Sequence, residues 1–260
     1  MYKQKKLFVC LFLIAFLIFS SCKSAEQRKE EERLAILYHN AGVKFFADGD
    51  YERALRNFSN AVKYDEKNPY YLNDLALTYS MLREYDTALR YFRKALSIKP
   101  NESEIRNGMA STLAIQGDLA DAIVEWKKVI NDPLYKSPSI VYYNLGKAYF
   151  QLGDIDSAKK SFHNVLKYDP KNVETLYFLG IISEKRGNYE EAARYYERSI
   201  AANPDFAPSH YNLGVNYYLR NLYPEAEAEF RWIVYSGKDE TLKIKAKEYL
   251  DKLNTSLKNK

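Results

Sequence analysis

A small residue recurs along this 260-residue chain at nearly constant spacing, and a large aromatic residue follows it four positions later. The small residues, spaced 34, 34, 36, 34 and 34 apart, are Ala54, Ala88, Ala122, Ala158, Ala192 and Ala226. The aromatic residues are Phe58, Phe92, Trp126, Phe162, Tyr196 and Phe230. A small side chain lets two helices approach closely, and a ring one turn later fills the space beside it, so this spacing predicts stacked helical hairpins.

Each period divides into two amphipathic helices joined by a short turn. In the first period, Tyr38, Gly42 and Phe45 lie on one helical face, and Gly49 supplies the turn. The pattern therefore predicts an all-α solenoid of six helix-turn-helix repeats, at 35–68, 69–102, 103–138, 139–172, 173–206 and 207–240. Residues 241–260 are expected to form a capping helix and tail, because Leu242, Ala246, Tyr249 and Leu253 share one apolar face.

These positions resemble the consensus of the tetratricopeptide (TPR) repeat over roughly residues 35–240. The second, fourth and fifth repeats meet it almost in full; the fourth has Tyr142, Leu145, Gly146, Tyr149, Gly153, Ala158, Phe162 and Pro170. The resemblance implies a TPR superhelix, in which the first helix of each repeat lines a concave face that binds other proteins.

Residues 1–21 have the features of an export signal. A charged start is followed by thirteen apolar residues from Leu7 to Phe19, fewer than the ~20 that span a membrane comfortably and typical of a signal peptide. The end of this segment, Phe19-Ser20-Ser21-Cys22, resembles the lipobox of bacterial lipoproteins, although Leu is commonest where Phe19 stands. The resemblance implies cleavage before Cys22 and acylation of this residue, whereas a cleaved soluble signal or an uncleaved anchor would be the alternatives.

Lipidation of Cys22 would anchor the chain stably, because more than one acyl chain is attached. Residues 22–34 would then be the lipidated N-terminus and a polar tether that becomes helical at the first repeat. Lys23 stands where Asp would retain a lipoprotein in the inner membrane. The expected location is therefore the bacterial cell envelope, lipid-anchored at the outer membrane and facing the periplasm.

The single 36-residue step marks a longer connection after the third repeat, at 131–139. Its Asp132-Pro133-Leu134-Tyr135 stretch, followed by a helix with Asn144-Leu145-Gly146, resembles the pilotin-like TPR lipoproteins of type IV pilus biogenesis, the PilF/PilW group. That resemblance implies a role in assembling the secretin, the pore through which the pilus emerges. The alternatives are a longer turn without function, a periplasmic scaffold that recruits peptidoglycan enzymes or outer-membrane assembly proteins, and a regulator held by an uncleaved anchor.

Charge and reactive side chains favour neither nucleic-acid binding nor catalysis. The net charge is +5, but loss of Lys3, Lys5 and Lys6 with the signal would leave 36 basic against 34 acidic residues, without a basic block. Both cysteines, Cys10 and Cys22, precede the repeats, so the repeats hold no disulfide or cysteine metal site. No catalytic motif occurs. We therefore expect no enzyme activity, no cofactor, no metal, no nucleic acid and no small-molecule substrate.

Protein binding is the function that the first helices favour. One non-core position reads His39, Asn73, Asn107, Tyr143, Tyr177 and Tyr211 through the six repeats. The next position reads Asn40, Asp74, Gly108, Asn144, Phe178 and Asn212. Asn amides can hold a peptide backbone, and Tyr offers a flat surface with a polar tip. The predicted partner-binding residues are Asn73, Asn107, Tyr143, Asn144, Lys147, Tyr177, Tyr211 and Asn212.

One alternative to this prediction remains open, and one kind of binding site is not expected. The tyrosines could merely pack between adjacent first helices. Lys147 is flanked by Ser111 and Ile181 at the equivalent positions, so the carboxylate clamp of chaperone-binding TPR domains, which needs several basic residues, is not expected.

Overall fold

The computed structural model describes residues 24–258, with side chains from 24 to 255. Every regular element among these residues is an α-helix, and successive helices pack as helix-turn-helix pairs, which confirms the predicted all-α fold of TPR superhelix type. The predicted signal peptide and Cys22 lie outside the described residues. The chain divides into two compact units, Met1–Asp118 and Leu119–Lys260.

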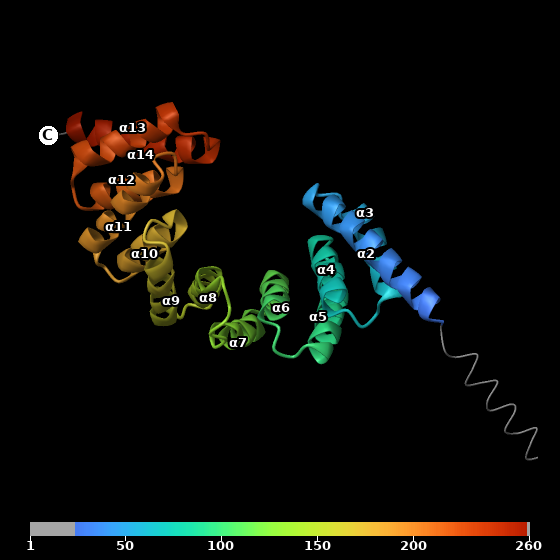
Figure 1. Cartoon of the computed structure of the whole chain (residues 1–260). Helices are drawn as coiled ribbons and strands as arrows, with labels where there is room; N and C mark the ends of the chain where they lie inside the picture. The colour runs from blue at the N-terminus through green and yellow to red at the C-terminus, as the bar shows by residue number, and fades with distance from the viewer. Residues whose placement is uncertain (1–23, 259–260) are drawn as a thin grey trace, which may run out of the picture. The chain divides into compact units, whose positions relative to one another are not determined.

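The first unit contains five helices among the described residues (Figure 1). They are α2 (Ala25–Ala47), α3 (Tyr51–Tyr64), α4 (Pro69–Met81), α5 (Tyr85–Ile98) and α6 (Ser103–Gln116). Helices α2 and α3 form one hairpin, α4 and α5 form the next, and α6 packs on both α4 and α5.

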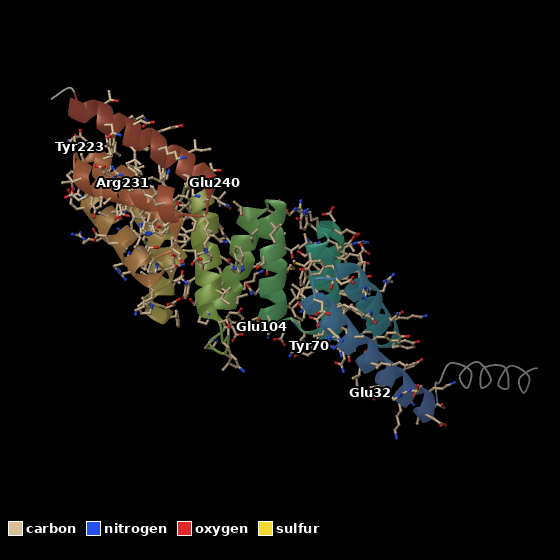
Figure 2. All side chains as sticks on the ribbon, turned by 90° about the horizontal axis from the view of Figure 1, so that it is seen from above. Glu32, Tyr70, Glu104, Tyr223, Arg231 and Glu240 are labelled. Carbon is tan, nitrogen blue, oxygen red and sulfur yellow. The ribbon has the colours of Figure 1, made fainter. Side chains whose placement is uncertain are left out.

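The second unit contains eight helices among the described residues, and Figure 1 shows them in chain order up to α14 in red. They are α7 (Leu119–Ile130), α8 (Pro138–Gln151), α9 (Ile155–Tyr168), α10 (Val173–Lys185), α11 (Tyr189–Ala202), α12 (Ala207–Leu219), α13 (Tyr223–Ser236) and α14 (Glu240–Lys258). Three hairpins, α8 with α9, α10 with α11 and α12 with α13, are followed by α14, which packs on α13. Tyr223 and Arg231, labelled in Figure 2, mark α13.

The alanine and aromatic ladder forms the core of both units. All six alanines are fully buried, and the six rings that follow them are buried, with Trp126 the most exposed at 3%. Opposite four of these rings, a glycine in the first helix of the same hairpin allows the contact: a Cβ added to Gly146 would lie 2.6 Å from Phe162, and one on Gly180 would lie 2.3 Å from Tyr196. Burial of each ring contributes about 1.5–3 kcal/mol, so the repeating pair stabilises the hairpins that lie within one unit.

The turns inside the hairpins need a left-handed residue. Gly49 has φ 78°, and Asn221 takes the same role in the last hairpin with φ 61°. Asn tolerates this conformation better than most residues because its short polar side chain bonds locally. Arg83, with φ 65°, fills the position in the α4–α5 hairpin, at some cost in backbone energy.

The first helix begins earlier than the sequence pattern indicated. Residues 25–34, predicted as a polar tether, already belong to α2. The reason is a capping box: the Gln27 backbone N–H donates to Ser24 Oγ (3.1 Å), and the Ser24 N–H donates to Gln27 Oε1 (3.0 Å). An ion pair between Glu30 and Arg33 adds support along the exposed face of this turn.

Candidate functional site

An apolar pocket opens on the first helices of the first unit. Its volume is about 290 Å³, close to the lower end of the ~300–1,000 Å³ usual for ligand sites. The side chains that line it are Val43, Phe46, Ala47, Phe58, Asp74 and Leu77. Val43 is 46% exposed although it is aliphatic, so part of the apolar lining of the pocket is uncovered.

Polar side chains close one edge of this pocket. His39 Nε2 lies 2.7 Å from Asp74 Oδ2, and Asn73 Nδ2 donates to Asp74 Oδ1 (3.0 Å). The His39 ring packs against Tyr71 with centroids 4.6 Å apart. Both carboxylate oxygens of Asp74 are therefore engaged, while Asn73 Oδ1 is buried without a hydrogen-bond partner in the described part of the chain.

The second unit carries a different surface in the corresponding place, which we call the aromatic platform: Tyr143 and Phe150 of α8 and Phe178 of α10. The Phe150 and Phe178 rings meet edge to face at 5.5 Å, and Tyr143 meets Phe178 at 6.4 Å. Phe178 also stacks on the buried Phe162 ring, with centroids 5.2 Å apart and planes 7° from parallel. The platform is partly exposed and rests on the core ladder.

Two lysines lie over the ends of this platform. Lys147 Nζ is 4.8 Å from the centroid of Tyr143, and Lys185 Nζ is 5.8 Å from that of Phe150. Such cation–π contacts contribute about 0.5–1 kcal/mol at exposed sites. Neither ammonium takes part in an ion pair within residues 24–255, so both retain hydrogen-bonding capacity for a partner.

A polar network lies beside the platform, between α10, α11 and α12. Tyr196 Oη donates to Glu184 Oε2 (3.1 Å), and Asn216 Nδ2 donates to Glu184 Oε1 (3.0 Å). Asn212 Nδ2 donates in turn to Tyr196 Oη (3.4 Å). Burial raises the pKa of Glu184, while the bonds from Asn216 and Tyr196 oppose this shift. Burial also raises the pKa of Tyr196.

The structure brings some of the predicted binding residues together. Tyr143, Asn144 and Lys147 lie within one turn of α8, and all three are partly exposed. Asn73 and Asn107 belong to the first unit, on α4 and α6, and both are partly exposed.

The other predicted residues take part in packing. Tyr177 meets Phe206 at 5.6 Å, edge to face. Tyr211 meets Phe230 and Tyr249 with both centroid distances at 6.2 Å. Burial raises the pKa of Tyr143, Tyr177 and Tyr211. The tyrosines thus pack between helices on one side and keep part of their surface exposed on the other, which leaves their binding role a prediction. Asn212 donates a hydrogen bond from its Nδ2 to the hydroxyl of Tyr196 (3.4 Å).

The sequence pattern missed part of both surfaces. Phe150 and Lys185 complete the platform, and Phe46 lines the pocket, yet none was singled out. Phe46, Phe150 and Glu184 occupy one repeat position, two turns beyond the predicted binding stripe. Continuing that stripe to the end of each first helix would have found Phe46 and Phe150.

The described residues hold no candidate cluster of metal ligands and no candidate membrane-spanning helix. Residues 24–258 contain no group of His, Cys, Asp and Glu side chains arranged to hold a metal ion. No helix in the same range combines the length and apolar character that crossing a bilayer requires.

Comparison with protein families identifies the repeats directly. Models described as tetratricopeptide repeat match residues 143–205, 184–238 and 69–102, and one described as TPR repeat matches 42–82. A TPR repeat-containing protein of Methanocaldococcus jannaschii, MJ1428, is 29% identical over 176 residues, which are 64% of this chain and 30% of the relative. Tetratricopeptide repeat protein 8 of Caenorhabditis elegans is 25% identical over 196 residues, 68% of this chain and 38% of the relative. The chain spans about a third of the length of these relatives.

The alignments with solved structures of similar fold extend over almost the whole length of those structures. PilF of Pseudomonas aeruginosa aligns with a TM-score of 0.72 and 19% identity over 86% of this chain and 99% of that one. PilW, described as a widely conserved type IV pilus biogenesis factor, aligns with a TM-score of 0.69 and 22% identity over 81% and 97%. YrrB, described as a TPR protein with an unusual peptide-binding site, aligns at 0.60 and 18% over 74% and 97%. At these identities the likeness concerns the fold.

Proposed function

The chain is a tetratricopeptide repeat protein, and on that premise we propose that it is a membrane-anchored scaffold that binds a segment of a partner protein. The observation that carries this proposal is the chemistry of the first helices. In both units they expose apolar or aromatic surface edged by polar side chains, as binding sites for peptide segments do.

We further propose that the partner belongs to a type IV pilus system and is its secretin. The fold aligns with nearly the full length of PilF and PilW. The connection 131–137, which carries the sequence resemblance to that group, also exposes an apolar side chain: Leu134 is 84% exposed. A free apolar side chain in a loop is suited to a partner contact. In this proposal Cys22 is lipidated and holds the chain at the outer membrane, facing the periplasm.

Deletion of the gene tests the pilus role. We expect loss of heat-resistant secretin multimers, measured by immunoblot, and loss of surface pili, measured by electron microscopy. A plasmid copy should restore both. Normal multimers and pili in the deletion strain would instead favour a scaffold for peptidoglycan enzymes or outer-membrane assembly proteins.

Metabolic labelling tests the anchor. Wild-type protein should incorporate a labelled fatty acid and float with outer-membrane vesicles, while Cys22→Ala should do neither. An unlabelled wild-type protein would contradict the lipoprotein proposal without affecting the binding proposal.

Three tyrosines allow a test of the binding face itself. Changing Tyr143, Tyr177 and Tyr211 together to Ala should lower capture of the secretin at least about tenfold, since large rings dominate protein interfaces. The matched control changes the exposed tyrosines of second helices, Tyr168, Tyr189 and Tyr235, and should bind like the wild type. Circular dichroism of both triple variants checks that the helices are retained. Equal capture by both variants would place the interface elsewhere.

A further inference from the structure

The aromatic platform of the second unit lies between two lysines that form no ion pair within the described residues. Ring and cation–π contacts connect the whole set in one line: Lys147 over Tyr143, Tyr143 against Phe178, Phe178 against Phe150, and Lys185 over Phe150. The five side chains come from α8 and α10, which are the first helices of adjacent hairpins. They form a partly exposed apolar surface with an ammonium group at each end.

Each lysine remains able to bind an anion. An ammonium group offers three donors, and a cation–π contact uses none of them in a hydrogen bond. Within the described residues neither lysine is paired with a carboxylate. The nearby Glu184 is already engaged by Tyr196 and Asn216, so it is not the counter-ion of Lys185.

We propose that this surface binds an acidic segment of the partner protein, in which an apolar or aromatic side chain is flanked by Asp or Glu. The apolar side chain would lie on the platform, and the flanking carboxylates would bond to Lys147 and Lys185. The inference rests on the proposed protein-binding function and specifies the chemistry of the partner.

A nearby carboxylate disfavours a nucleic acid at this surface, although aromatic rings and lysines can bind single strands. The carboxylate of Glu174 lies close enough to Tyr143 to raise the pKa of its hydroxyl, second to burial. This negative charge opposes a continuous polyanion at the Lys147 end. Separate carboxylates on either side of an apolar residue can reach the two lysines and avoid Glu174.

The arrangement also differs from the carboxylate clamp that the sequence argued against. Lys147 and Lys185 come from different repeat positions, the second lying at the last residue of α10. Their separation by three rings suits two carboxylates with an apolar side chain between them better than one terminal carboxylate.

Peptide binding to the full-length chain in nonionic detergent tests the inference. The probes are a short fluorescein-labelled peptide with one phenylalanine between aspartates, its copy with asparagines, and a single-stranded oligothymidylate. By fluorescence anisotropy, the acidic peptide should bind about tenfold more tightly than the asparagine copy, since two charge pairs distinguish them. The advantage should shrink as salt is raised.

Paired charge variants locate the effect. Lys147→Gln with Lys185→Gln should remove most of that advantage and leave the affinity for the asparagine copy unchanged within about twofold. The control, Lys160→Gln with Lys171→Gln, removes the same charge at exposed positions of the same unit and should retain it. Thermal unfolding of both variants shows whether either change acts through stability. Equal affinity for the two peptides, equal behaviour of the two variants, or tighter binding of the oligothymidylate would each overturn the inference.

The phenotype separates this inference from the proposed function. In the deletion strain, the Lys147→Gln, Lys185→Gln copy should restore fewer secretin multimers than the control copy. Full restoration by both copies would overturn the role of the two lysines and leave the pilus function standing. Normal multimers in the deletion strain would contradict the pilus function, while the peptide measurements would still decide the chemistry of the surface.

Discussion

The two units use different polar pairs to join consecutive first helices at the same repeat positions. In the first unit, Thr112 Oγ1 donates to Ser80 Oγ (3.0 Å) and joins two consecutive first helices. In the second unit, Asn216 Nδ2 donates to Glu184 Oε1 at the same distance. Both pairs join residues 32 apart in the sequence, at identical repeat positions. A neutral pair in one unit is thus replaced by a pair that contains an ionisable group in the other.

This difference explains a departure in the core ladder. Tyr196 stands where four of the other five repeats have Phe. Its ring packs against Gly180 as the phenylalanines pack against their glycines, while its hydroxyl donates to Glu184. A buried carboxylate needs such donors because an unpaired charge is costly away from water. The ladder therefore fixes the fold, and the positions around it are free to build different surfaces.

The largest expected effect comes from removing the ring below the platform. Phe162→Ala should cost about 3–5 kcal/mol of local stability, through lost burial and the cavity left behind. The loss should also disorder Phe178, which stacks on this ring. Hydrogen exchange measured by mass spectrometry should show faster exchange in α8, α9 and α10.

Helices α2 to α5 provide the internal comparison for this variant. Their exchange rates should stay unchanged if the two units are energetically separate. Phe162→Leu, which keeps most of the volume, should cost less than about 1.5 kcal/mol. An equal effect of the Leu and Ala variants would contradict the cavity argument.

The polar pairs themselves predict a smaller and unequal effect. Asn216→Ala should cost about 1.5–3 kcal/mol, because it removes a hydrogen bond to a charged group; the same amide also donates to the Tyr189 carbonyl (3.1 Å). Thr112→Val should cost about 0.5–1.5 kcal/mol, because only neutral hydrogen bonds are lost, to Ser80 Oγ and to the Gly108 carbonyl (both 3.0 Å). Urea unfolding of the two variants tests the difference. Equal costs would show that the charge of Glu184 adds nothing to its pairing.

The fold was predictable from the sequence because its determinants repeat. Six copies of a small residue followed by a ring specify the hairpins, since few other arrangements bury both at that period. The start of α2 at Ala25 was missed because the segment is polar. Its helix depends on the capping box of Ser24 and Gln27 rather than on an apolar face.

The candidate surfaces were only partly predictable. The stripe through Tyr143 and Lys147 follows from repeat register alone, so the sequence pointed to α8. Phe150 was missed because the stripe was not followed to the end of the first helix. Lys185 was missed because it acts across a hairpin boundary, and contacts between different repeat positions depend on the angle between helices. The pocket around Val43 and Phe46 was missed because apolar residues on a first helix are expected in the core.

The smallest expected effect concerns the pH dependence of the second unit. Burial raises the pKa of Glu184 above its ordinary value of 4.5, so the folded state binds this proton more tightly than the unfolded state. Its contribution to stability is therefore fully present below pH 4.5 and is lost as the pH rises through the folded pKa. Glu184→Gln avoids this loss of stability at high pH, because the amide carries no charge. Its Oε1 can still accept the hydrogen bond from Asn216. At pH 7 the variant should be more stable than the wild type by less than about 1 kcal/mol.

The difference between wild type and Glu184→Gln should shrink as the pH falls toward 4.5, where the wild-type carboxyl also becomes neutral. Urea unfolding at a series of pH values measures it. Glu66→Gln, at an exposed turn of the first unit, controls for the change in net charge and should show no such trend. A Gln variant that is less stable than the wild type at pH 7 would mean that the hydrogen bonds from Tyr196 and Asn216 outweigh the cost of burying the charge. The Glu184 and Asn216 pair of the second unit would then stabilise the fold more than the Thr112 and Ser80 pair of the first unit does.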